Sequence, residues 1–263
     1  KMEEKKVAIL IDGDNISPKY AEYIKQEAAR SGRIKICRLY GSITSPTVKA
    51  WYKEMPKYGI TPVLQINYID NKSIADQALT IDAMDILYEE EIDVICLVSS
   101  DSDFTKLAYR IKESGKFVIG MGEQKANESI VQACDEFKML DLIYKINIED
   151  KNVENEISEE QLNIEEENEE NGQNLIGEEV DVATYVPTEK EIVDNIKQIL
   201  DDDWENLANV GMILNKQRPG FDTRIYGCRS MKQLIEKHCD VFDIKAELAK
   251  DQIHKVIYAK LKS

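Results

Sequence analysis

Histidine, cysteine pairs and long apolar runs are scarce in this chain of 263 residues. The two histidines, His238 and His254, lie near the C-terminus, so histidine-centred acid–base chemistry is not expected before them. The 5 cysteines include no Cys-x-x-Cys pair, which argues against a disulfide or zinc framework and favours a reducing compartment, the cytoplasm. No uncharged apolar run approaches the roughly 20 residues of a membrane span, and no signal-peptide pattern follows the N-terminus. A membrane partner is therefore not expected.

The net charge of −16 is distributed unevenly along the chain. Residues 149–181 carry 14 acidic side chains and one basic side chain, whereas residues 1–148 carry 23 acidic and 20 basic ones. Residues 182–263 carry 13 of each sign. Because the acidity belongs mostly to one segment, the charge does not exclude nucleic acid as a partner of the flanking parts.

The acidic segment is rich in Glu and Asn and nearly free of aromatic residues, with no lasting helical or strand period. Such a segment buries too little apolar surface to offset the entropy of ordering, so we predict a disordered linker over residues 149–186. A solvated acidic helix is the alternative, since Glu favours helix. The linker divides the chain into an N-terminal domain, 1–148, and a C-terminal domain, 187–263.

Strand-like and helix-like patterns alternate in the N-terminal domain. Strands are expected at 7–11, 34–40, 61–66, 93–98, 116–120 and 137–142. Helices are expected after Ser17-Pro18, after Ser45-Pro46, at 73–91, after the 93–98 strand through Ile111, and at 127–134. This order predicts an α/β fold with a mostly parallel sheet flanked by helices.

Two of the buried strands end in closely spaced carboxylates. The run Val7–Ile11 is followed by Asp12-Gly13-Asp14-Asn15, and the run 94–98 is followed by Ser99-Ser100-Asp101-Ser102-Asp103. The carboxyl ends of parallel strands are where ligands bind in open α/β sheets. If the two strands are neighbours, these like charges would need a cation between them, and Mg²⁺ is the natural partner of such oxygen ligands. The alternative is that these residues only form turns and cap helices.

A third acidic position, Asp76, lies in the first turn of the helix expected at 73–91. An acid there can serve only to offset the helix dipole. Asp82 and Asp85 lie on other faces of that helix, so we expect Asp76 to point at the site and the other two to be surface or supporting groups.

The motifs Ile9-Leu10-Ile11-Asp12-x-x-Asn15, Lys72-x-x-x-Asp76 and Ser99-Ser100-Asp101-Ser102-Asp103-Phe104 together resemble the NYN domains of the PIN-like ribonuclease group. The resemblance spans about residues 5–145 and implies metal-dependent cleavage of RNA phosphodiester bonds with Mg²⁺ or Mn²⁺. It implies catalytic, metal-binding roles for Asp12, Asp76, Asp101 and Asp103, with Asn15, Asp14 and Ser99 as supporting residues. Ser100 stands where the family pattern has glycine.

In the C-terminal domain, helices are expected at 188–200, 206–216 and 230–238, with a hairpin at 241–246 and 252–258. This is the outline of a small winged helix-turn-helix. The Arg218-Pro-Gly-Phe-Asp222 turn and the Tyr226-Gly227 that follows resemble the OST-HTH/LOTUS domain over about 187–260, which implies RNA binding or, in some members, protein contacts. Residues that would contact phosphates are Lys216, Arg218, Arg224, Arg229 and Lys232.

The leading prediction is a cytoplasmic, metal-dependent endoribonuclease with a tethered RNA-binding module that acts on single-stranded or structured RNA. A non-catalytic RNA-binding or protein-adaptor protein with a vestigial site is the alternative from another class. A phosphatase of the haloacid-dehalogenase type is a weaker third, because Asp12-Gly13-Asp14 also fits its Asp-x-Asp motif while the residues that follow fit it poorly.

Overall fold

The computed structural model describes residues 4–66, 74–89, 91–148, 187–200, 203–248 and 255–262. The predicted linker at 149–186, Lys72 and His254 lie outside the described residues. Among the helices that are described, none combines the length and apolar character needed to cross a membrane.

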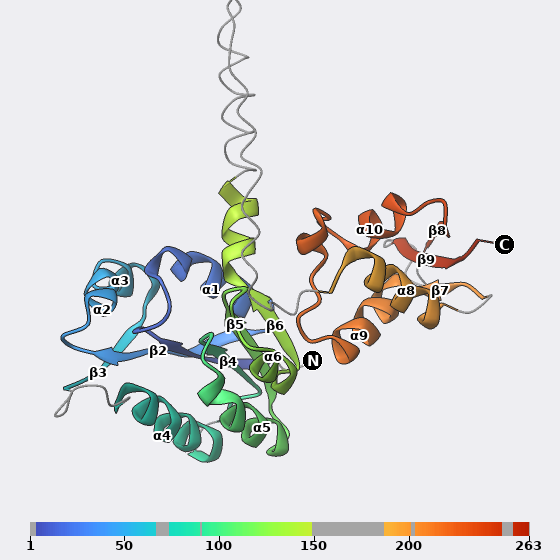
Figure 1. Ribbon diagram of the computed structural model, residues 1–263. Coiled ribbons are helices and arrows are strands. Elements are labelled where there is room, and N and C mark those ends of the chain that lie inside the picture. The colour runs from blue at the N-terminus through green and yellow to red at the C-terminus, as the bar shows by residue number, and fades with distance from the viewer. Residues whose placement is uncertain are drawn as a thin grey trace, which may run out of the picture.

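The N-terminal domain is built around a six-stranded sheet whose described strand pairs are all parallel (Figure 1). The strands are β1 (Lys6–Asp12), β2 (Arg33–Ser42), β3 (Thr61–Gln65), β4 (Val94–Val98), β5 (Phe117–Gly122) and β6 (Glu136–Met139). Their spatial order is β3-β2-β1-β4-β5-β6. The α/β fold with a mostly parallel sheet is confirmed.

Helices cover both faces of this sheet. They are α1 (Ala21–Ala29), α2 (Pro46–Trp51), α3 (Glu54–Tyr58), α4 (Ile74–Glu89), α5 (Thr105–Glu113) and α6 (Glu128–Ala133), with short 3-10 turns η1 (Pro18–Tyr20) and η2 (Ser102–Phe104). Val7, Ile9 and Ile11 pack toward α1, α2 and α3, whereas Ala8 and Leu10 pack toward α4 and α5. All five residues of this run are fully buried, which explains why its sequence is continuously apolar and not alternating.

The strand order places a topological switch point beside β1. The chain builds outward from β1 through β2 to β3, then returns to the other side of β1 as β4 and continues outward to β5 and β6. The carboxyl ends of β1 and β4 are therefore adjacent, with Ile11 paired with Val98. Ligand sites in open α/β sheets lie at such a point.

The sequence prediction was wrong at the end of the sheet. A strand was expected at 137–142, but β6 ends at Met139 and residues 140–148 are helical. Leu140 is buried in the core on the α1 side, so tertiary packing outweighs the apolar run that suggested a longer strand.

The described part of the C-terminal domain has three α-helices and a three-stranded sheet. Its elements are α8 (Glu189–Ile199), β7 (Glu205–Asn206), α9 (Leu207–Gln217), η3 (Thr223–Tyr226), α10 (Met231–Lys237), β8 (Phe242–Leu248) and β9 (Lys255–Leu261). A capping box joins Thr188 and Glu191 at the start of α8, as their spacing predicts. The expected terminal hairpin is present as β8 and β9, and β7, which was not expected, adds a strand beside β9.

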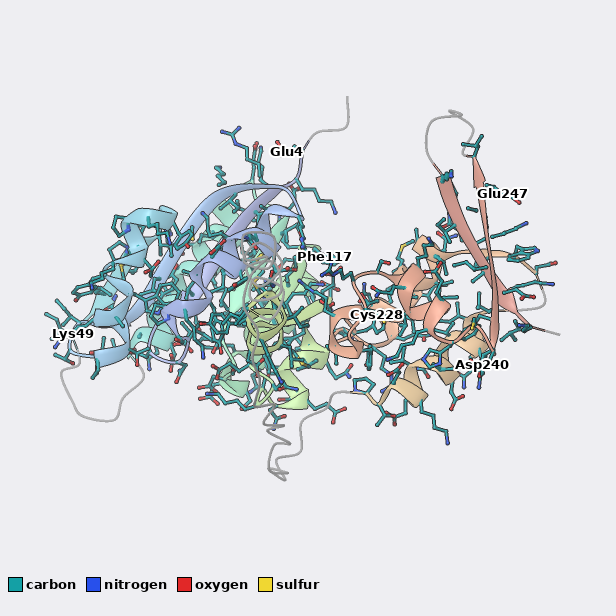
Figure 2. The ribbon with its side chains drawn as sticks, turned by 90° about the horizontal axis from the view of Figure 1, so that it is seen from above. Glu4, Lys49, Phe117, Cys228, Asp240 and Glu247 are labelled. Carbon is teal, nitrogen blue, oxygen red and sulfur yellow. The ribbon has the colours of Figure 1, made fainter. Side chains whose placement is uncertain are left out.

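The two domains are in contact through the segment 218–224. The Phe137 amide of β6 donates a hydrogen bond to the Pro219 carbonyl at 2.5 Å. The Arg224 guanidinium contacts Glu27 of α1, with Nη1 2.7 Å from Oε1 and Nη2 3.1 Å from Oε2, and it also binds Asp222. Phe117 lies at the boundary between the domains, while Lys49 lies at the far end of the N-terminal domain (Figure 2).

Candidate active site

Asp12 is the last residue of β1 and the most deeply buried acid at the carboxyl edge of the sheet. Its side chain is 1% exposed. Its Oδ2 accepts hydrogen bonds from Asn15 Nδ2 at 2.8 Å and from Ser99 Oγ at 2.7 Å, and its Oδ1 accepts one from the Asn15 amide at 3.3 Å. The next residue, Gly13, lies so close to β2 that an added Cβ would be 2.6 Å from Leu39. The chain therefore turns tightly after Asp12 with its carboxylate directed toward β4.

Ser99 connects the ends of the two adjacent strands. It follows β4 directly and is 1% exposed. Its hydroxyl donates to Asp12 and accepts a hydrogen bond from the Asp101 amide at 3.0 Å. Asp101 in turn caps η2, because its Oδ1 accepts from the Asp103 amide at 2.9 Å. The two Asp-containing motifs are thus brought together, as the sequence predicted, and Ser99 is the residue that links them.

Ser100, which replaces the glycine of the family pattern, is accommodated by the end of β5. Its hydroxyl accepts a hydrogen bond from the Glu123 amide at 2.9 Å. A Cβ added at Gly122 would lie 2.9 Å from this hydroxyl, so the glycine of β5 provides the room that Ser100 uses. The substitution therefore ties the Asp101 loop to β5.

The pKa of Asp12 is raised from 3.8 to about 6. Burial is the main cause, since it disfavours the charged form, and the negative charge of Asp76 adds to it. Hydrogen bonds from Asn15 and Ser99 act in the opposite direction. Asp76 is in the first turn of α4 and half-buried, and its charge acts on Asp12 at the end of β1. The shifted pKa is typical of a functional site.

Other acidic residues of the motifs have different surroundings. The carboxylate of Asp14 accepts a hydrogen bond from the Ser42 amide at 2.9 Å, so it braces the end of β2. Asp103 is exposed on η2. Asp82 binds Arg38 and Tyr40 on β2, and Asp85 is exposed on the outer side of α4.

The donor set fits a divalent cation in chemistry, because carboxylate oxygens are the ligands that hard cations prefer. Asp12 and Asp76 form the pair whose mutual repulsion a cation would relieve. Two hydrogen bonds through the Ser99 hydroxyl link Asp12 to the backbone amide of Asp101. Within the described ranges, however, no three His, Cys, Asp or Glu side chains lie close enough together to bind one ion. The side chains as they stand supply a pair of carboxylates and not a complete ligand set.

Sequence reasoning missed one acid at the same edge. Glu123 follows β5, and its carboxylate accepts a hydrogen bond from the Tyr20 hydroxyl at 3.0 Å and pairs with Lys125 at 2.7 Å. The signal was available, since Glu123 also comes directly after a buried strand. Lys19 and Lys125 are exposed cations beside this group, so the carboxyl edge carries positive as well as negative charge.

The basic residues predicted for RNA binding have different surroundings. Lys216 and Lys232 are exposed and line a cavity between the domains, and Arg229 is exposed beside a second one. Arg218 is half-buried at the end of α9. Arg224 is held between Glu27 and Asp222, with its side chain 16% exposed and that of Glu27 4% exposed. In the structure Arg224 therefore contacts the other domain.

Comparison with known proteins places these features in context. No curated protein matches the chain. Among solved structures, a protein of unknown function from Vibrio parahaemolyticus is 21% identical, with a TM-score of 0.45, and the match covers 53% of this chain and 94% of that one. An uncharacterized protein from Nitrosomonas europaea is 25% identical, with a TM-score of 0.25, and the match covers 38% of this chain and 93% of that one.

Family profiles identify both domains. The NYN domain profile matches residues 6–141, and the OST-HTH/LOTUS profile matches residues 188–253, in the order that the motifs predicted. An NYN domain of the PIN-like nuclease group followed by a LOTUS domain indicates a nuclease-type, RNA-associated function. The chain belongs to the NYN family and carries an OST-HTH/LOTUS domain after its NYN domain.

Proposed function

We propose that this protein is a metal-dependent endoribonuclease that hydrolyses RNA phosphodiester bonds. The observation that carries the proposal is the convergence of Asp12, Asp76 and the Ser99–Asp101 loop at the switch point between β1 and β4. A buried carboxylate beside a second acid, at the edge where α/β sheets bind ligands, supports a cation-dependent reaction.

Four acids would hold the metal, Asp12, Asp76, Asp101 and Asp103, and the ion would be Mg²⁺ or Mn²⁺. Such an ion, when bound, polarises the scissile phosphate and lowers the pKa of an attacking water. Asn15 and Ser99 fix the orientation of the Asp12 carboxylate through the hydrogen bonds described above. Asp14 supports the turn by binding the Ser42 amide.

The LOTUS domain would bind single-stranded or structured RNA and hold it near the nuclease domain. Lys216, Arg218, Arg229 and Lys232 are the residues we propose for phosphate contacts. Arg224, which the sequence also suggested, is assigned to the domain contact because its guanidinium binds Glu27 and Asp222. The free state of all five cysteines supports a cytoplasmic location.

The test is cleavage of labelled RNA by the full chain with Mn²⁺ or with EDTA. Wild type with Mn²⁺ should cut internal bonds and leave 5′-phosphate ends, whereas Asp101→Asn should not. Asp85→Asn is the matched control, because Asp85 is an exposed acid of α4 outside the site. Cutting that survives EDTA or Asp101→Asn would contradict the proposal. Phosphate release from a monoester with intact RNA would instead support the phosphatase.

One observation favours the second candidate, a non-catalytic RNA-binding or protein-adaptor protein. No three metal-binding side chains meet among the residues described, which is what a vestigial site would show. RNA binding without cleavage under any divalent metal would support this candidate, and binding of a protein partner without RNA would support its adaptor form.

A further inference from the structure

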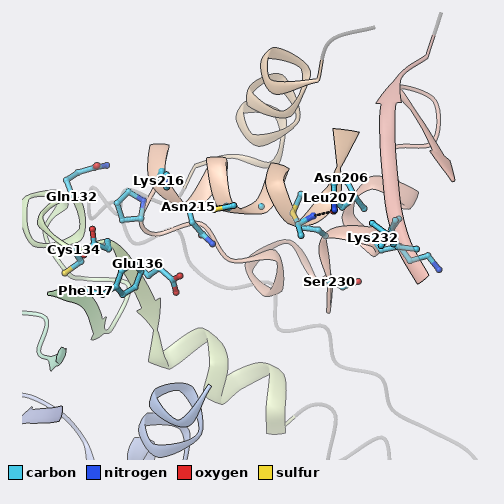
Figure 3. A pocket seen from close by; sticks show the side chains of 18 of the residues that line it. Phe117, Gln132, Cys134, Glu136, Asn206, Leu207, Asn215, Lys216, Ser230 and Lys232 are labelled. Carbon is cyan, nitrogen blue, oxygen red and sulfur yellow. Dashed lines mark hydrogen bonds between the residues drawn. The ribbon is translucent and has the colours of Figure 1, made fainter. Parts of the chain in front are cut away.

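A cavity of about 990 Å³ lies between the two domains, away from the candidate active site. The NYN side contributes Phe117 and Glu136, which begin β5 and β6, whereas the candidate site lies at the carboxyl ends of the strands. The LOTUS side contributes residues of α9, α10 and β9 (Figure 3). The cavity exists because the segment 218–224 holds the domains together.

The lining is more positive than the chain as a whole. It includes four lysines, Lys112, Lys216, Lys232 and Lys255, and two acids, Asp135 and Glu136. Asp135 pairs with Lys112 at 3.3 Å and Glu136 with Lys138 at 3.1 Å. Lys232 pairs with Glu236 of its own helix at 3.3 Å, an exposed pair that contributes little, and Lys216 and Lys255 have no ion pair within the described ranges. Since the net charge of the chain is −16, a cavity with excess lysine selects an anionic ligand.

Asn215 of α9 supplies the most specific sign of a ligand. Its Oδ1 is the one side-chain polar atom, among the residues that the structure describes, that is buried without a hydrogen-bond partner. A buried acceptor left unpaired costs about 1–3 kcal/mol. Asn215 lines both this cavity and the second one beside Arg229, and a turn of its side chain that brings Oδ1 to the interdomain cavity would let a ligand supply the missing donor. Figure 3 shows Asn215 on the cavity wall opposite Phe117 and Glu136.

Apolar side chains complete the lining, with Phe117 on one side and Leu207, Met231 and Ile257 on the other. A ligand that matches the whole lining has an anionic part for the lysines, a flat apolar part for these side chains and a donor for Asn215. A nucleotide has all three, because a nucleobase carries amino or imino donors on an apolar ring and a phosphate carries the charge.

We propose that this interdomain cavity is a nucleotide-binding site, in which Asn215 accepts a hydrogen bond from the base and Lys216 and Lys232 bind the phosphate. The nucleotide is either part of an RNA strand or free. Binding of an RNA strand rests on the proposed function, whereas binding of a free nucleotide does not. Because the site is formed by both domains, an occupant also stabilises their docked arrangement.

The test measures binding to the full chain in EDTA, where metal-dependent cleavage cannot occur. The probes are a labelled short single-stranded RNA, followed by anisotropy, and the four nucleoside 5′-monophosphates as competitors. The variants are Asn215→Leu and Lys216→Gln. Lys49→Gln is the matched control, since Lys49 is an exposed lysine at the far end of the NYN domain (Figure 2).

Asn215→Leu should weaken RNA binding about tenfold, the equivalent of one hydrogen bond in a buried site. Lys216→Gln should weaken it about threefold, and Lys49→Gln should leave Kd unchanged within about twofold. Asn215→Leu should not lower Tm, because it removes an unpaired buried atom. A residue with only a structural role would lower Tm and leave Kd unchanged, so the two readouts separate the roles.

If a monophosphate displaces the RNA, the cavity binds a single nucleotide. If monophosphates do not displace the RNA, the cavity binds a nucleotide only as part of an RNA strand. Wild-type affinity in Asn215→Leu would overturn the proposal, as would equal losses in Lys216→Gln and Lys49→Gln. Cleavage with Mn²⁺ is scored separately. RNA binding without cleavage would contradict the proposed nuclease and support the cavity site. Cleavage by a protein whose RNA affinity does not change in Asn215→Leu would support the nuclease and contradict the cavity site.

Discussion

Replacing Asp12 with asparagine should stabilise the protein while it abolishes the proposed activity. The Asp12 carboxyl is 1% exposed, and its pKa is about 6 in the folded protein against an ordinary value of 3.8. The folded state therefore holds the proton more tightly than the unfolded chain does. The contribution of Asp12 to the free energy of unfolding is therefore greatest below about pH 4. It falls as the pH rises through about 6 and is lowest above that pH. The shift corresponds to about 3 kcal/mol.

Asparagine has the shape of aspartate without the charge, and its carbonyl can still accept hydrogen bonds from Ser99 and Asn15. One of the three hydrogen bonds to Asp12 is lost, at a cost of about 1 kcal/mol, which leaves a gain of about 2 kcal/mol above the native pKa. For a chain of this size that gain raises Tm by about 4–8 °C. At about pH 5 the difference should shrink, because native Asp12 is then mostly protonated.

The assay is thermal unfolding of wild type, Asp12→Asn and Asp85→Asn in EDTA at about pH 8 and about pH 5. Asp85→Asn changes an exposed acid and should move Tm little at either pH. Adding Mg²⁺ should raise Tm in the wild type and have much less effect in Asp12→Asn, since a bound cation stabilises only the folded state. A Tm for Asp12→Asn that is lower than wild type by the same amount at both pH values would refute the reasoning.

Three further changes test other parts of the structure. Ser99→Ala removes a hydrogen bond that lowers the pKa of Asp12, so the acidic limb of a pH–rate profile should move to higher pH by up to about one unit; an unmoved limb would contradict this role. Glu27→Gln removes the ion pair with Arg224 and should weaken domain docking by about 2 kcal/mol. The radius of gyration measured by small-angle scattering should therefore increase, and Arg30→Gln, the control, should not increase it. Trp51→Phe replaces the buried indole with a smaller ring and loses its hydrogen bond of 2.9 Å to the Ile16 carbonyl in the loop after β1. The lost bond and the cavity together should lower stability in urea by at least about 1 kcal/mol, and an unchanged midpoint would contradict this.

Much of the sheet could be predicted because its strands are apolar on both faces. The runs in β1 and β4 are five residues each and fully buried, and a helix pattern follows each of them. Such runs indicate a parallel sheet without any knowledge of partners. The end of β6 could not be predicted in this way, because the burial of Leu140 depends on helix packing from elsewhere in the chain.

The sequence suggests which acids belong to the candidate site, but it does not reveal the hydrogen bonds that connect them. Asp12 and Asp101 stand out because each comes after a buried strand, and the two motifs lie at one edge once β1 and β4 are neighbours. The double hydrogen bond of Ser99 and the support of Ser100 by the Glu123 amide depend on backbone geometry after the strands, which residue types do not determine. From the residue types alone these serines also fit a turn that caps a helix, and only the family resemblance gives Ser99 a supporting role.

The contact between the domains had no signal in the sequence. Arg224 and Glu27 are 197 residues apart, and each has the composition of an ordinary exposed charge. Buried charges are costly unless paired, and that pairing is visible only once both domains are placed. The sequence suggested a C-terminal domain joined to the rest by a linker, and the structure adds a direct contact between Pro219 and Phe137.

The central claim is that the Asp12 corner cuts RNA, and its most direct test is the Mn²⁺-dependent cleavage rate of a labelled RNA with enzyme in excess. Asp12→Asn should reduce this rate by at least about 10³-fold while the protein remains folded and binds RNA as tightly as wild type. Asp85→Asn should cut at the wild-type rate. Cleavage by Asp12→Asn at the rate of Asp85→Asn would contradict the account.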